Sequence, residues 1–395
     1  GRDIDIIIKR KDFFSIRKLI VDSFYRAGFY LIQYYKGSEM FTMVFASIGD
    51  KANIISFDFL FSIYAKNFVM IESEDVLKTR IFNGKIYHVR KDWEFLAKYL
   101  YNAILNNNYP EKYKSIKEDA LSSYSSDIEA RLSDLGIKDC FSSVDSKKMK
   151  RKIWVLHFLR TVGSTLRYGW TTVDNLMDTC GITIGFTGPD GSGKTTVIKE
   201  IENILISVFN NLQIFHFRPL LIGNLSDVTY NIGLKKTVDH DYDKPHRGGK
   251  TSVLSSIFRL FYYSVDYILG YRAKVYRPLF HRNIVIFDRY YTDIICDSRR
   301  SRIYLNIKFL YWFGRLFVPS LDYNILLTGD TNTILSRKQE LDEKGIETIN
   351  NKIDYLKNKK DYYKVMNEST PQAAVAEILR IVFKEQHRKN LKRLK

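Results

Sequence analysis

The stretch that decides the fold is Ile182-Thr-Ile-Gly-Phe-Thr-Gly-Pro-Asp-Gly-Ser-Gly-Lys-Thr-Thr196. Its apolar first part, Ile182–Thr187, predicts a buried strand, and Thr195–Phe209 predicts a helix. Between them, Gly188–Thr195 fits the pattern G-x-x-x-x-G-K-[ST]. Glycines let the backbone wrap closely around a phosphate, and the helix N-terminus adds partial positive charge. The sequence therefore predicts a nucleoside triphosphate site.

The residue types in this loop indicate how the triphosphate would be held. Lys194 is expected to reach the β- and γ-phosphates, and the hydroxyl of Thr195 is expected to bind Mg²⁺. The other loop residues expected to surround the nucleotide are Gly188, Asp190, Gly191, Ser192 and Gly193.

A second feature follows about a hundred residues later. Four apolar residues, Ile284–Phe287, predict a buried parallel strand, and Asp288 then lies at its carboxyl end. Ligands of open α/β sheets bind at that edge. A carboxylate there can hold Mg²⁺ or orient an acceptor oxygen, and Arg289 can neutralise a phosphate on the acceptor.

Strands and helices alternate through this half of the chain. The further expected elements are a strand at Gln213–Phe217, a helix at Ser252–Tyr276 and a strand at Tyr323–Leu327, after which helices close the chain. Such alternation is typical of α/β folds that have a parallel sheet with helices on both faces. The predicted fold class is therefore α/β.

Phe186–Thr196, taken with Phe287-Asp-Arg-Tyr290, resembles thymidylate kinase over roughly residues 180 to 383. The resemblance implies a P-loop NTPase sheet, with Lys194, Thr195 and Thr196 holding ATP and Mg²⁺. It also implies that Asp288 and Arg289 meet the acceptor.

The chain also resembles a divergent branch of kinase-like proteins found with bacterial surface-polysaccharide genes. The matching stretches are Phe215–Pro219, Phe261–Tyr263, Asp297–Arg300 and Arg337–Leu341. This resemblance implies that Arg218 lies near the acceptor's phosphate. Arg337–Leu341 lacks the Arg-rich lid and Gly-rich segment of thymidylate kinases, so thymidine monophosphate is not assigned as the acceptor.

Three arginines, Arg299, Arg300 and Arg302, cluster just after the second feature. They can form a clamp that supplies positive charge to the triphosphate or the acceptor, with Arg299 in a catalytic role and Arg300 binding substrate. The alternative interpretation is a solvated run of surface charge.

The first part of the chain predicts a smaller α+β domain. The expected elements are strands at Ile4–Ile8, Tyr30–Tyr35, Met40–Ser47 and Ala52–Ile63, and helices at Asp12–Arg26 and Asp92–Leu105. A basic helix opens at residues 147–152 and runs to about residue 168. The predicted organisation is an α+β domain over residues 1–135, a helical connection over 136–179 and a P-loop domain over 180–395.

This first domain carries its own candidate metal site. Asp3 and Asp5 lie on one face of a strand because side chains alternate, and Asp58 on a later strand can complete a triad. Convergent carboxylates bind the Mg²⁺ ions used in pyrophosphate-releasing reactions. The arrangement resembles the nucleotidyltransferase fold. A degenerate domain that only binds a substrate is the alternative.

The net charge of the chain bears on which class of partner it binds. Lys and Arg number 62 against 44 Asp and Glu, a net charge of +18. The basic residues are scattered through amphipathic helices, so we do not expect nucleic acid to be the partner. Residues 147–152 and the basic tail after 387 can face solvent or an anionic membrane.

No apolar run reaches the roughly 20 residues of a membrane span. Three widely spaced cysteines favour a reducing compartment.

We therefore expect a cytoplasmic phosphotransferase, with the inner face of the membrane as an alternative location. It would move the γ-phosphoryl of Mg-ATP to a saccharide, a glycolipid or a nucleoside monophosphate. The alternative function is a nucleotidyltransferase or nucleic-acid-binding protein that uses the Asp-x-Asp domain. A homodimer is left open.

Overall fold

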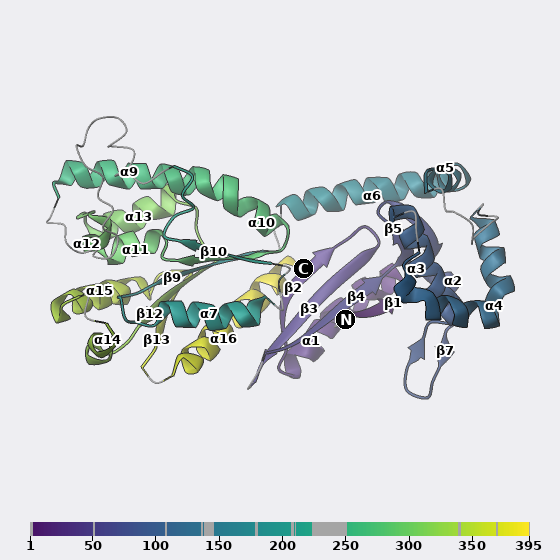
Figure 1. Ribbon diagram of the computed structural model, residues 1–395, viewed down its shortest axis with the longest axis horizontal. Coiled ribbons are helices and arrows are strands. Elements are labelled where there is room, and N and C mark those ends of the chain that lie inside the picture. Colours follow the sequence, from purple (N-terminus) through teal and green to yellow (C-terminus); the bar gives the residue numbers. More distant parts are fainter. Residues whose placement is uncertain are drawn as a thin grey trace. The chain divides into compact units, whose positions relative to one another are not determined.

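The computed structural model describes residues 3–49, 52–106, 109–135, 137, 146–177, 181–206, 209, 211–222, 251–338, 341–368 and 370–394 (Figure 1). The chain divides into two compact units. Unit 1 comprises Gly1–Ser47 and Ile54–Asp178, and unit 2 comprises Thr179–Lys395 with Ile48–Asn53. Cys140, Cys180, Gln339 and Glu340 lie outside the described residues.

Unit 2 is built on a parallel five-stranded sheet with the order β10-β11-β9-β12-β13. The strands are β9 (Ile182–Thr187), β10 (Leu212–His216), β11 (Ile284–Asp288), β12 (Tyr323–Thr328) and β13 (Tyr362–Met366). The inner strands β9, β11 and β12 are buried along their whole length, as expected of a sheet covered on both faces. The predicted parallel sheet is confirmed. Strand β13 replaces part of the helical ending predicted from the sequence.

Helices cover both faces of this sheet. They are α7 (Lys194–Leu205), α9 (Val253–Gly270), α10 (Tyr276–Phe280), α11 (Tyr291–Cys296), α12 (Ser298–Ser301), α13 (Ile307–Phe317), α14 (Thr331–Arg337), α15 (Glu343–Leu356) and α16 (Pro371–Arg393). Helices α7 and α16 lie on one side, and α9, α11 and α13 on the other (Figure 1). A π-helical turn, Tyr271–Val275, joins α9 to α10 where a single helix was expected.

Unit 1 contains a four-stranded sheet with the order β1-β4-β3-β2. Its strands are β1 (Asp3–Ile7), β2 (Tyr30–Lys36), β3 (Met40–Ile48) and β4 (Ala52–Leu60). Helix α1 (Arg10–Arg26) packs on one face through aromatic side chains. Phe13 lies 4.8 Å from Phe59, and Phe24 stacks on Phe45 at 4.3 Å between ring centroids. This α+β order follows from the alternating apolar residues of the strands.

The rest of unit 1 forms a second, mainly helical core. Its elements are β5 (Ser62–Ala65), β6 (Phe68–Glu72), α2 (Ser73–Lys78), β7 (Ile81–Phe82), β8 (Tyr87–His88), α3 (Lys91–Asn106), η1 (Glu111–Tyr113), α4 (Lys114–Asp134), α5 (Ser146–Leu156) and α6 (Phe158–Met177). Met149 and Ile153 of α5 are buried in this core beside α3. The region expected to be a helical connection thus packs within unit 1, as two helices rather than one.

Candidate functional site

The loop between β9 and α7 forms the centre of the site. A Cβ on Gly188 would lie 1.9 Å from the backbone oxygen of Leu327, so only glycine fits there. Gly191 and Gly193 have φ angles of +88° and +84°, in the left-handed region that favours glycine. Helix α7 begins directly after Gly193, so its first backbone N–H groups lie beside the loop. This is the strand–loop–helix context that the motif requires.

Lys194 lies folded against the loop. Its side chain is buried, with 6% of the residue exposed, and its Nζ donates hydrogen bonds to the backbone oxygens of Gly188 at 2.9 Å and Pro189 at 2.8 Å. Burial lowers the pKa of Lys194 to about 7, and the positive charge of Arg289 acts in the same direction. Thr195 and Thr196 follow on the exposed first turn of α7.

Asp288 lies at the carboxyl end of β11, beside the end of β9 with which β11 pairs. It is 7% exposed, and its Oδ2 lies 3.2 Å from Nδ1 of His216 at the end of β10. Its Oδ1 is buried and has no hydrogen-bond partner among the described residues. An unpaired, buried carboxylate oxygen fits a cation ligand, because such a group is costly when left unsatisfied. This donor chemistry suits Mg²⁺.

Arg289 has a backbone conformation that is unusual for a residue with a side chain. Its φ is +74°, in the left-handed region. Its backbone N–H donates a hydrogen bond to the backbone oxygen of Phe186 at 2.9 Å. Its guanidinium donates to Asp190 of the loop and, at 2.9 Å, to Oδ1 of Asp293. Burial alone would lower the pKa of Arg289, but the carboxylates of Asp293 and Asp190 outweigh burial and raise it. The guanidinium therefore stays charged.

Arg300 also reaches the loop. Its guanidinium pairs with the second carboxylate oxygen of Asp190, so that carboxylate is shared by Arg289 and Arg300. The structure thus brings two of the predicted arginines to the P-loop. Arginine guanidinium groups bind phosphate oxygens in paired hydrogen bonds, so this cluster is suited to a phosphorylated ligand.

The other three predicted arginines lie in different surroundings. Arg302 directly follows α12, and its backbone oxygen accepts a hydrogen bond from Oγ1 of Thr251 at 3.0 Å. Arg299 donates to Oδ1 of Asp342 at 2.9 Å on the exposed surface. Arg218 is buried, donates to Oδ2 of Asp266 at 3.1 Å and lies over the ring of Tyr263. Arg218 therefore contributes to the packing of β10 against α9 in this structure.

Two residues near the loop were missed by sequence reasoning. Asn367 follows β13, and its Nδ2 donates to the backbone oxygen of Ser192 at 2.8 Å. The backbone oxygen of Asn367 in turn accepts a hydrogen bond from Arg337 at 2.9 Å. The second is His216, whose Nδ1 lies beside Asp288 and which was not among the predicted site residues. Its position at the end of β10, matching that of Asp288 on β11, was the available signal.

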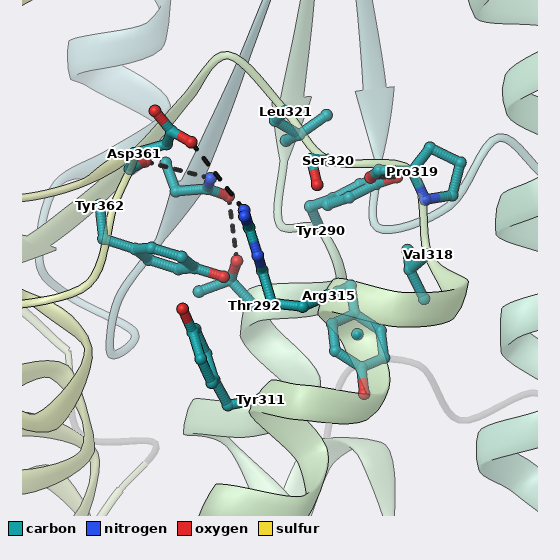
Figure 2. Close-up of a pocket in the computed structure, with 13 residues that line it drawn as sticks. Tyr290, Thr292, Tyr311, Arg315, Val318, Pro319, Ser320, Leu321, Asp361 and Tyr362 are labelled. Carbon is teal, nitrogen blue, oxygen red and sulfur yellow. Dashed lines mark hydrogen bonds and ion pairs between the residues drawn. The ribbon is translucent and has the colours of Figure 1, made fainter.

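A small cavity lies at the opposite, amino-terminal ends of β12 and β13 (Figure 2). Oγ1 of Thr292 donates to Oδ1 of Asn324 at 3.1 Å, and Nδ2 of Asn324 donates to the backbone oxygen of Asp361 at 3.2 Å. The cavity measures about 30 Å³, which suits a water molecule rather than a substrate. The candidate site remains at the carboxyl ends of the strands.

In unit 1, two of the three carboxylates predicted to bind metal lie opposite each other on neighbouring strands. Asp5 and Asp58 are register partners on the parallel strands β1 and β4, on the sheet face away from α1. Oγ1 of Thr42 donates to Oδ1 of Asp58 at 2.5 Å. The side chain of Asp3 lies outside the described part of the chain. Among the side chains that are described, no three of His, Cys, Asp or Glu lie close enough to hold a metal.

Among known proteins, the chain is similar to a solved structure at low sequence identity. No protein-family model and no curated protein matches the chain. The crystal structure of thymidylate kinase from Ehrlichia chaffeensis is similar at 17% sequence identity and a TM-score of 0.33. The match covers 51% of this chain and 98% of that chain. The likeness concerns half of this chain, and the interpretation of the site rests on the geometry of its own residues.

Proposed function

We propose that unit 2 transfers the γ-phosphoryl group of Mg-ATP to an acceptor. The observation that carries this proposal is the pairing of β9 with β11, which holds Lys194 in the loop next to Asp288 and Arg289. A phosphate-binding loop beside a carboxylate and arginines supplies the parts that phosphoryl transfer requires. Catalysis would then come from positioning and charge neutralisation.

Each residue has a role in this proposal. The backbone N–H groups from Asp190 to Thr196 bind the phosphates, and the ammonium of Lys194 turns from the loop oxygens toward the β- and γ-phosphates. Asp288 and Thr195 would hold Mg²⁺, which neutralises charge on the phosphate oxygens when bound. Arg289 and Arg300 bind the phosphate that moves or the phosphate of the acceptor. Arg218 near the acceptor and Arg299 in catalysis remain predictions. The pairing of Arg299 with the exposed Asp342 favours the alternative of a solvated surface charge for that residue.

The acceptor is proposed to be a saccharide or glycolipid, or else a nucleoside monophosphate. The resemblance of four sequence stretches to kinase-like proteins of surface-polysaccharide genes favours the first class. The P-loop and the Asp288–Arg289 pair suit either class, because both need a phosphate donor and an oriented oxygen. A cytoplasmic location belongs to the same proposal, while a homodimer and a location at the inner face of the membrane remain open alternatives.

A second candidate function belongs to unit 1. The register of Asp5 opposite Asp58 favours a nucleotidyltransferase site, since neighbouring carboxylates on parallel strands can share metal ions. This reaction would release pyrophosphate and transfer the nucleotidyl group, which carries the α-phosphate.

The position of the label in ATP separates the two functions. The full chain is incubated with ATP labelled at either the α- or the γ-phosphate, together with a panel of nucleoside monophosphates and cell-envelope saccharides. The proposal expects transfer of the γ-label only, lost in Lys194→Ala and kept in Lys199→Ala, a matched change on the exposed face of α7. Transfer of the α-label that is lost in Asp58→Asn would instead support unit 1. Unchanged γ-transfer by a folded Lys194→Ala would overturn the proposal.

A further inference from the structure

Helix α6 packs on unit 1 through its polar face and exposes its apolar face, the reverse of an ordinary surface helix. Its polar side chains attach it to the rest of unit 1. Arg160 pairs with Glu72 at 3.0 Å, and Arg167 pairs with the buried Glu39. Surface helices normally bury their apolar side and expose their polar side.

The C-terminal half of α6 is held in the same way. Asp174 pairs with Nζ of Lys36 at 3.1 Å, and Nδ2 of Asn175 donates to the backbone oxygen of Lys36 at 2.8 Å. Together with Arg160 and Arg167, these residues recur at helical spacing on one face of α6. The polar contacts therefore fix the rotation of the helix about its axis.

The face directed away from these contacts is apolar and exposed. Leu159 is 84% exposed, Leu166 is 70% exposed and Trp170 is 76% exposed. Val173 continues the same stripe, which follows the i, i+7, i+11, i+14 spacing of one helix face. The end of α5 adds exposed Trp154, Val155 and Leu156, followed by Phe158 at the start of α6. An apolar surface of this extent marks an interaction site.

The charge of this region selects the kind of partner. Residues 146–177 contain seven lysines and arginines and a single acid, Asp174, which is already paired with Lys36. Most of the cations lie on α5, immediately before the apolar stripe. Basic residues next to a stripe of leucine and tryptophan are typical of helices that lie in the interface of an anionic bilayer.

We propose that α5 and α6 dock the protein on an anionic lipid surface, with α6 lying in the plane of the interface. Leu159, Leu166 and Trp170 would enter the boundary between headgroups and acyl chains, and the α5 cations would contact lipid phosphates. No helix in the described ranges has the length and apolar character needed to cross a membrane. The surface is independent of the P-loop site.

Vesicle binding by the full chain tests this proposal. We expect the protein to sediment with vesicles of phosphatidylcholine mixed with phosphatidylglycerol, and much less with phosphatidylcholine alone. Leu166→Glu should weaken partitioning at least about tenfold, because it removes a leucine from the apolar contact. The matched control is Leu19→Glu, an equivalent change at a 63% exposed leucine of α1, which should bind as the unaltered protein does.

The contribution of the cations to vesicle binding is tested by a second variant with its own matched control. Lys147→Gln with Arg151→Gln should lower partitioning into the mixed vesicles by about fivefold per cation. Lys11→Gln with Lys18→Gln, two exposed cations of α1, should have little effect. The tryptophan emission should shift to shorter wavelength on vesicles, and Trp170→Phe should reduce this shift.

Three outcomes would overturn the proposal. They are absence of binding to the mixed vesicles, equal binding by the Leu166→Glu protein, and a dimer in vesicle-free solution that Leu166→Glu abolishes. The third result would assign the face to a second copy of the chain. Phosphoryl transfer in vesicle-free solution should be the same in Leu166→Glu, so failure of this inference and failure of the proposed activity are distinguishable.

Discussion

The carboxylate of Asp190 in the P-loop accepts a hydrogen bond from the guanidinium of Arg289, which lies 99 residues later in the chain. The second oxygen of the same carboxylate accepts from Arg300. Asp190 therefore acts as the counter-ion of two guanidinium groups that face the loop. This relationship gives the aspartate at the third position of the motif a structural role, and it couples the loop to the end of β11.

Asp190→Asn should change stability and anion affinity in opposite directions. We expect the free energy of unfolding to fall by about 3 kcal/mol, because a largely buried ion pair loses one partner. Affinity for inorganic phosphate and for ATP should rise, since the guanidinium groups are less neutralised. Urea unfolding and calorimetric titration measure the two effects. Asp342→Asn, the exposed partner of Arg299, is the control and should change neither quantity.

The two neighbouring arginines should differ in their effect on turnover. Arg300→Ala should lower kcat/KM by about 100-fold, the usual loss when a group that stabilises transition-state charge is removed. Arg299→Ala should leave it nearly unchanged, since that guanidinium pairs with Asp342 at the surface. Steady-state kinetics of the two variants decide between them. A larger loss in Arg299→Ala would instead support the catalytic role that the sequence predicts for Arg299.

The local parts of this site could be predicted from the sequence, and the distant parts could not. Ile182–Thr195 and Ile284–Arg289 combine apolar strands with loop residues whose chemistry is visible within a few positions. Asn367 could not be found in this way, because its contact with Ser192 depends on β13, a short edge strand with half-buried side chains.

In unit 1, too, only part of the structure could be predicted from the sequence, but for a different reason. Asp5 and Asp58 could be placed on strands from alternation, and their register depends only on how β1 pairs with β4. The orientation of α6 was beyond prediction, because an amphipathic pattern predicts a buried apolar face, whereas α6 exposes Leu159, Leu166 and Trp170. Polar contacts such as Asp174 with Lys36 decide it.

Gly188→Ala should prevent the loop from closing against β12. The new Cβ would lie 1.9 Å from the backbone oxygen of Leu327, and a backbone atom cannot move aside as a flexible side chain can. We expect a loss of about 3 kcal/mol or more in the free energy of unfolding, as for other severe overpacking. Thermal or urea unfolding of the full chain measures it.

Gly329→Ala provides the matched control within unit 2. A Cβ there would meet its nearest neighbour at 3.5 Å, an ordinary contact. Its effect on stability should be within about 1 kcal/mol. Equal losses in the two alanine variants would contradict the close approach of Gly188 to β12.

Asn367→Ala should loosen the P-loop. The substitution removes the hydrogen bond to the backbone oxygen of Ser192, and we expect the free energy of unfolding to fall by about 1 kcal/mol. ATP affinity should fall as well, because the loop is less well ordered before it binds phosphate. Asn332→Ala, on the exposed start of α14, is the control. Unchanged ATP affinity in Asn367→Ala would show that this contact does not position the loop.

The pH dependence of nucleotide binding should follow Lys194. Burial lowers its pKa to about 7 in the folded chain, below the ordinary lysine value of about 10.4. The unfolded chain therefore binds more protons between these values, and this group makes the free energy of unfolding rise with pH across that window. Bound phosphates favour the ammonium form, so ATP binding should take up a proton above about pH 7. Affinity should then fall by up to about tenfold per pH unit.

Calorimetric titration in buffers of different ionisation enthalpy measures this proton uptake directly. Lys194→Arg should abolish it, because a guanidinium stays protonated throughout the range. Lys199→Arg on the exposed face of α7 should leave it unchanged. The same ATP affinity at about pH 6.5 and about pH 9 would mean that Lys194 is already charged before nucleotide binds. In that case the hydrogen bonds to Gly188 and Pro189, rather than burial, would determine its protonation.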